Sequence, residues 1–121
     1  MGAWGSGAFD NDEASDWSSE LVEADDLSLV HNTLSCAEEV DDDELDASLR
    51  AEALAACEVV ARLLGRAGAR DQRTELVDQW VRAHPARPSQ QLVRLATSVL
   101  DRIAATGSSV PSDLRKRVAG A

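Results

Sequence analysis

The sequence predicts an all-α protein, and three observations lead to this fold class. Apolar residues recur at helical spacing over most of the chain. No segment shows the period-two alternation of β-branched or aromatic residues that is typical of strands. Alanine and leucine, both strong helix formers, are abundant, whereas aromatic residues make up only 3% of the 121 residues. We therefore expect a single domain over 1–121, with five or six helices around an aliphatic core.

The first helix is predicted to begin next to Asp10, a good N-cap residue. Glu13 follows three residues later and completes a pair that resembles a capping box. Apolar positions then repeat on one helical face as far as Leu21, and the acidic stretch 23–26 interrupts them. The apolar pattern resumes over 27–37, so the sequence allows either a second helix or a kinked continuation of the first.

The strongest prediction is a helix over 45–65, after an acidic turn at 41–44 that marks its start. Apolar residues cover most of its circumference, which indicates a central, largely buried helix. Its charged residues step by four or eight positions and are expected to form a narrow stripe that faces solvent: Arg50, Glu58, Arg62 and Arg66. Glu58 and Arg62 have the spacing of a favourable ion pair, and Gly65 and Gly68 are expected to end the helix.

Three shorter helices are predicted in the remainder of the chain. Asp71 is a suitable cap for the first of them, and His84-Pro85 ends it. The next has a regular amphipathic pattern over 92–104, followed by a Thr-Gly-Ser stop. Pro111-Ser112-Asp113 starts the last, which has two apolar anchors, so the tail 109–121 is expected to fray.

The charge of the chain is unevenly distributed along it. Residues 1–47 contain fifteen Asp or Glu and no Lys or Arg, whereas residues 48–121 contain twelve Lys or Arg and seven Asp or Glu. The two parts carry −15 and +5 within a net charge of −10. This pattern argues against nucleic-acid binding by the first part. It favours a basic protein partner, contact with the basic half of the same chain, or an acidic surface that only keeps the protein soluble.

The expected location is the cytoplasm. No stretch approaches the roughly 20 apolar residues of a membrane helix, and no basic segment followed by an apolar run predicts a secretory signal. The two cysteines, Cys36 and Cys57, are far apart and form no pair motif, which is typical of reduced thiols.

The opening stretch MGAWGSGAFDND places a tryptophan among three glycines and a phenylalanine before the first helix. The glycines disfavour a helix, so we expect residues 1–9 to form a loop that inserts Trp4 and Phe9 into the bundle as a plug. The alternative is a glycine-lined loop that holds a ligand. The rim of that site would be formed by Trp4, Asp10, Asn11 and Asp12.

The same stretch carries a resemblance to a known family. The run of Trp4, Gly5, Gly7 and Phe9, followed by Asp-Asn-Asp, is similar to the opening of the bacterial proteins grouped as domain of unknown function family 4259. The segments AEALAACEVVARLLG at 51–65 and DQWVRAHP at 78–85 resemble two of the family's helices. The resemblance implies a small helical cytosolic protein and brings no reaction with it.

No cofactor or metal is predicted. The chain has two histidines and two cysteines that would suit zinc, but they form no close pair motif: His31, Cys36, Cys57 and His84. A calcium-binding EF-hand loop that starts at Asp41 fails where Leu45 and Asp46 replace a ligand and the glycine, which leaves weak divalent binding or a solvated acidic turn. Motifs for nucleophilic catalysis are absent from the sequence, so an enzyme is the less favoured class.

Protein binding is the function that the sequence favours. Carboxylates occupy most positions from Glu38 to Asp46, and groups packed this densely raise one another's pKa unless a cation comes near. The predicted partner surface consists of Asp41, Asp42, Asp43 and Glu44. It would dock a basic protein, as small acidic inhibitors or immunity-type proteins do. The alternatives are internal pairing of this run with Arg87, Arg94 and Arg102, or a small enzyme or ligand-binding protein with a pocket at the Trp4 loop.

Overall fold

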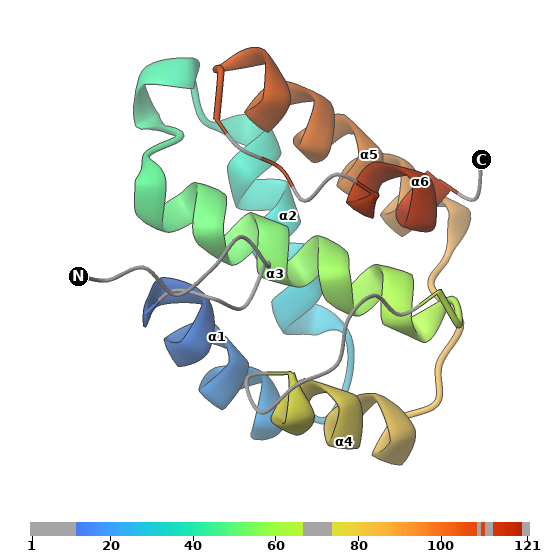
Figure 1. The fold of residues 1–121 in the computed structure, drawn as a ribbon. Coiled ribbons are helices and arrows are strands. Elements are labelled where there is room, and N and C mark those ends of the chain that lie inside the picture. Colours follow the sequence, from blue (N-terminus) through green and yellow to red (C-terminus); the bar gives the residue numbers. More distant parts are fainter. Residues whose placement is uncertain (1–11, 67–73, 109, 111–112, 120–121) are drawn as a thin grey trace.

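The computed structural model describes residues 12–66, 74–108, 110 and 113–119, and all regular structure in these residues is helical (Figure 1). The elements are α1 (Asp12–Val22), α2 (Ser28–Glu39), the short 3₁₀ helix η1 (Asp42–Glu44), α3 (Ala47–Leu63), α4 (Glu75–Ala83), α5 (Gln90–Ala105) and α6 (Leu114–Ala119). The all-α class is therefore confirmed. The predicted N-terminal plug over 1–9, Gly68 and the expected cap Asp71 lie outside the described residues.

The centre of the molecule is α3, which contacts each of the other five α-helices and crosses the middle of Figure 1. Its composition explains this position, because small side chains let neighbouring helices approach from several sides. Four alanines of α3 are fully buried: Ala53, Ala55, Ala56 and Ala61. The prediction of a central, largely buried helix is confirmed.

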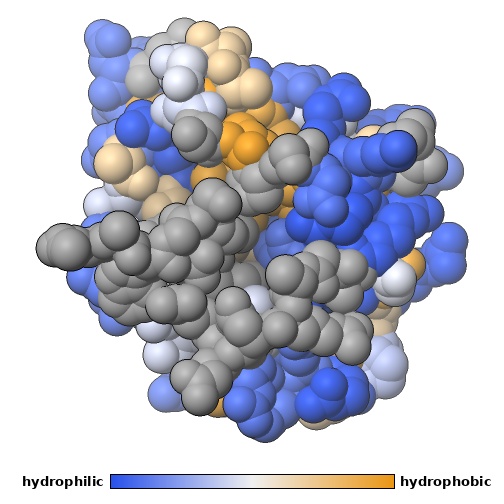
Figure 2. All heavy atoms as spheres, viewed as in Figure 1, coloured by the Kyte–Doolittle hydropathy of each residue, from blue (hydrophilic) through white to orange (hydrophobic). Residues whose placement is uncertain are grey.

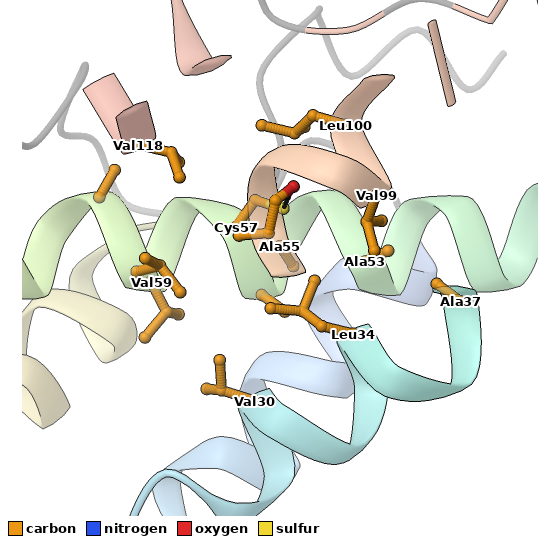
Figure 3. Packing of buried hydrophobic residues seen from close by; sticks show 14 of the residues in the cluster. Val30, Leu34, Ala37, Ala53, Ala55, Cys57, Val59, Val99, Leu100 and Val118 are labelled. Atoms are coloured by element: carbon orange, nitrogen blue, oxygen red, sulfur yellow. Dashed lines mark hydrogen bonds between the residues drawn. The ribbon is translucent and has the colours of Figure 1, made fainter. Parts of the chain in front are cut away.

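The core is mainly aliphatic and continuous around α3, and it also contains the buried Trp17 and Trp80. Figure 3 shows Val30 and Leu34 of α2 on one side of α3, and Leu100 of α5 and Val118 of α6 on the other. All four side chains are at most 1% exposed. The six-residue α6 is too short to be stable alone, so its burial against α3 and α5 determines where it lies.

Local polar contacts fix where α2 and α3 begin. The Asp26 carboxylate accepts a hydrogen bond of 2.9 Å from the backbone N–H of Ser28. Asp26 lies in the non-helical connection 23–27 between Val22, the end of α1, and Ser28, the start of α2. The pattern over 27–37 therefore belongs to a second helix and not to a continuation of the first. In the same way, Asp46 caps α3 by accepting a 2.9 Å hydrogen bond from the N–H of Leu49. The helix therefore begins at Ala47, two residues later than predicted.

The helix ends agree with the breaker residues. Leu63 is the last residue of α3, and Gly65 follows with φ of 81°, a conformation that costs glycine little. His84 is the C-cap of α4, directly before Pro85. Ser89 caps α5 through its hydroxyl, and Gly107, with φ of 84°, follows the end of that helix.

The predicted solvent-facing stripe on α3 is wrong at two of its four positions. Glu58 and Arg62 are only 4% and 6% exposed, because α4 and α6 cover that side of α3. These helices bring complementary charges: the Arg62 guanidinium pairs with Asp78 of α4, and Glu58 pairs with Arg117 of α6. The predicted pair of Glu58 and Arg62 is also present, at 3.4 Å.

Within the part of the chain that the structure describes, no helix has the length and apolarity needed to cross a membrane. The face of the molecule seen in Figure 2 is mostly hydrophilic over the described residues, with a smaller apolar area among them.

Candidate functional site

The predicted acidic surface lies in the connection between α2 and α3, at the left of Figure 1. Two backbone hydrogen bonds close this turn, from the N–H groups of Glu44 and Leu45 to the carbonyl oxygen of Asp41. Leu45 is 1% exposed and holds the turn to the core. As a result the side chains of Asp41, Asp43 and Glu44 are exposed. The side chain of Asp42 lies outside what the structure describes.

The turn is held from its other end by Arg102 of α5. The Arg102 guanidinium donates hydrogen bonds to the carbonyl oxygens of Ala37, Glu38 and Val40, at 2.6, 2.8 and 2.8 Å. These carbonyls belong to the last turn of α2 and to its C-cap, where a cation is favourable because the helix leaves acceptors unpaired. The backbone that carries Asp41 is thus anchored to α5.

The fold brings carboxylates of α1 to the start of α3. The pKa of Glu52 is raised above its ordinary value, first by partial burial and then by the negative charges of Glu20, Asp46 and Glu13. Glu13 and Glu20 belong to α1, which packs against α3. This contact was missed from the sequence, although Glu13, Asp16 and Glu20 follow one another at helical spacing beside the apolar face of α1.

We call the resulting surface the acidic face. It consists of Glu13, Glu20, Asp41, Asp43, Glu44, Asp46 and Glu52. Six of the seven side chains are exposed and Glu52 is half-buried. No described Lys or Arg forms an ion pair with any of them. Every ion pair between two described residues instead joins partners from Glu58 onwards in the chain.

The described contacts of the arginines that were candidates for internal pairing do not include the side chains of Asp41, Asp43 or Glu44. Arg87 and Arg94 are exposed and make no ion pair with a described residue. Arg102 binds backbone carbonyls at the end of α2. The side-chain charge of the described acidic face is therefore left to solvent or to a partner.

The residues expected at the rim of a ligand loop are largely outside the described part of the chain. Trp4, Asp10 and Asn11 fall there, and Asp12 is the first, exposed residue of α1. The structure does hold a cavity of about 430 Å³ between the α1–α2 connection and the end of α4. Its lining includes Trp80, whose indole N–H donates to the carbonyl oxygen of Ala24 at 2.9 Å.

The histidines and cysteines that would suit zinc are distributed over α2, α3 and the end of α4. His31 and Cys36 are exposed on α2, whereas Cys57 is fully buried in α3 and its thiol donates to the Ala96 carbonyl oxygen at 3.6 Å. Burial strongly raises the pKa of the Cys57 thiol. His84 stacks on the indole of Trp80, with ring centroids 4.5 Å apart. In the described residues no three His, Cys, Asp or Glu side chains are placed to hold a metal ion.

Fold and site together define a small all-helical protein. Next to its central helix lies an acidic face whose carboxylates form no ion pair with a described residue. The chain belongs to the family described as Domain of unknown function (DUF4259), whose sequence profile matches residues 2–116. No curated protein and no solved structure gives a significant match to the chain. The description of the family names no activity.

Proposed function

We propose that this protein is a non-enzymatic binding module whose acidic face docks a basic surface of another protein, in the manner of an inhibitor or immunity protein. The observation that carries the proposal is a set of seven carboxylates around the start of α3 that form no ion pair with a described basic residue. Glu13, Glu20, Asp46 and Glu52 lie near one another, and the remaining three lie in the turn that precedes Asp46. In the same molecule, four carboxylates of the second half do form ion pairs: Glu58, Asp78, Asp101 and Asp113.

The electrostatic state of the face supports this function. Partial burial is the first cause of the raised pKa of Glu52, and repulsion by the neighbouring carboxylates raises it further. A basic partner would relieve this repulsion on binding. Such a surface also accelerates association with a positively charged protein, and the effect weakens as salt screens the charges.

The geometry of the turn supports recognition as well as attraction. Leu45 anchors the turn in the core, and Arg102 anchors the preceding helix end. Asp41, Asp43 and Glu44 are thereby presented on a backbone that is held at both sides, which lowers the entropy that binding would cost. We also propose a cytoplasmic location, because the free thiols of Cys36 and Cys57 suit a reducing compartment.

The test is affinity capture from native lysate with two charge-matched variants. The first, D41N/D43N/E44Q, neutralises three carboxylates of the acidic face. The control, E23Q/D25N/E75Q, neutralises three exposed carboxylates elsewhere, so that both variants have the same net charge.

We expect the wild-type protein and the control to retain the same basic protein at low salt, and the first variant to lose it. The captured protein is then purified and its binding to each variant is measured directly. Retention of the same protein by all three forms, or equal loss by both variants, would contradict the proposal. Failure of the wild-type protein to retain any basic protein would contradict it as well.

A further inference from the structure

A second charged site lies at the other end of α3. The helix has 17 residues, roughly 25 Å of rise, and the acidic face lies at its start. A cavity of about 370 Å³ lies where its C-terminal end meets the beginning of α5 and the end of α6. Leu64, Val93 and Val118 form apolar parts of the wall. The remaining wall includes three arginines and an amide: Arg66, Arg87, Arg94 and Gln90.

Within the described part of the chain, no negative charge compensates the arginines of this cavity. No Asp or Glu among the described residues lines it, and none of its three arginines forms an ion pair with a described carboxylate. The Arg66 guanidinium donates a hydrogen bond of 3.1 Å to the backbone carbonyl oxygen of Arg117. Arg87 and Arg94 are exposed. Three like charges around one cavity repel one another. They lie together although the net charge of the chain is −10.

The neighbouring arginines are paired with carboxylates, so in this region of the described chain the excess of positive charge lies at the cavity. Arg62 pairs with Asp78, Arg115 with Asp101 at 2.6 Å, and Arg117 with Glu58. Asp78, Asp101 and Glu58 are thus engaged with arginines that do not line the cavity. An anion from outside is the group that would neutralise Arg66, Arg87 and Arg94.

The chemistry of the wall selects the class of anion. Guanidinium groups present several N–H donors in a planar fork that matches the oxygens of phosphate or carboxylate. Three arginines from separate segments suit a phosphate group better, because it carries up to two charges and has more than two acceptor oxygens. The apolar wall suits an organic body, and the cavity has the size of a small-molecule site. We infer that this cavity binds a small organic phosphate, with Arg66, Arg87 and Arg94 around the phosphate group.

The site extends along α5. A second, more open cavity of about 650 Å³ shares Val93, Arg94 and Ala119 with the first and continues past Thr97 and Asp101. Arg94 therefore lies at the junction of the two cavities. This position places the phosphate near the start of α5 and leaves room for the organic body along the helix. The inference is independent of the acidic face, so either can fail without the other.

Binding is tested by NMR titration of the full chain with phenyl phosphate at constant ionic strength, with benzoate as the carboxylate probe. We expect saturable shifts of the Val93 and Val118 amide signals, with a dissociation constant on the order of 1 mM or tighter. R87Q and R94Q should each weaken binding about tenfold, the usual effect of losing a charge-assisted hydrogen bond. The control R82Q removes an exposed arginine of α4 that does not line the cavity and should leave binding unchanged.

Three results would overturn the inference. One is the absence of saturable shifts in the wild-type protein. Another is equal binding of phenyl phosphate by R82Q and by R87Q and R94Q. The last is binding of benzoate as tight as that of phenyl phosphate, which would show that the site does not select phosphate. Because Arg87 and Arg94 make no ion pair with described residues, their replacement leaves the internal contacts of the fold in place.

Discussion

Replacing Glu58 by glutamine should destabilise the protein strongly, because the carboxylate is buried between two arginines. Glu58 is 4% exposed and accepts two hydrogen bonds from the Arg117 guanidinium, one of them at 2.9 Å. Its Oε1 atom also lies 3.4 Å from Nε of Arg62, whose side chain is 2% exposed. Glutamine keeps the shape but removes the charge that faces two guanidinium groups.

The size of the effect follows from burial. Removing one partner of a buried ion pair costs about 3–5 kcal/mol, because the other charge stays out of water. Arg117 keeps a contact of 3.2 Å with the exposed Asp113, and glutamine keeps one acceptor oxygen. We therefore expect a decrease in the free energy of unfolding at the lower end of this range, about 3 kcal/mol. This is a large part of the roughly 5–15 kcal/mol that a folded domain usually has.

The assay is urea-induced unfolding at pH 7, followed by far-UV circular dichroism and tryptophan fluorescence. The control E23Q removes an exposed carboxylate after α1 and should change the free energy of unfolding by less than about 0.5 kcal/mol. In the variant E58Q/R117Q the loss should be smaller than the sum of the two single losses, since each partner then lacks the other. A loss of less than about 1 kcal/mol in E58Q would refute the reasoning.

Three further predictions concern pH, thiol chemistry and packing. The pKa of Glu52 is raised in the folded protein, so the free energy of unfolding falls as pH rises from the unfolded to the folded pKa of this group. The variant E52Q should therefore be more stable than the wild-type protein at pH 7, by no more than about 1 kcal/mol, and equally stable in acid. Thermal unfolding at both pH values measures this difference. Ellman's reagent at pH 8 should modify Cys36 quickly and the buried Cys57 only after unfolding, so that C36S shows no fast phase. W17F should lower the free energy of unfolding in urea by about 1–3 kcal/mol, because the buried hydroxyl of Thr33 then loses the 2.9 Å hydrogen bond from the indole N–H. A smaller decrease in W17F than in the control E23Q would contradict this prediction.

The helices could be predicted from the sequence because their signals are local. The apolar pattern over 92–104, with Ser89 before it and Gly107 after it, predicts α5 almost to the residue. Asp46 shows the limit of such signals. It lies inside the predicted helix of 45–65 but caps α3, because its carboxylate binds the N–H of Leu49.

The partners of buried charges could not be predicted, since they come from distant parts of the chain. Glu58 and Arg117 are 59 residues apart, and periodicity alone indicates an exposed Glu58. The same limit applies to the acidic face. The sequence shows the dense run at 41–44, but only the packing of α1 on α3 places Glu20 near Glu52. The three arginines that line the cavity at the end of α3 likewise come from separate segments, so no sequence motif predicts that they lie together.

The most direct test of the proposed function is the affinity of the purified basic partner for the two charge-matched variants at low and high salt. Our account predicts that D41N/D43N/E44Q binds at least about tenfold more weakly than the wild-type protein at low salt. It also predicts that E23Q/D25N/E75Q binds as the wild-type protein does, and that the difference shrinks at high salt. Equal affinities of the two variants would show that only net charge matters, and would contradict the acidic face as a binding site.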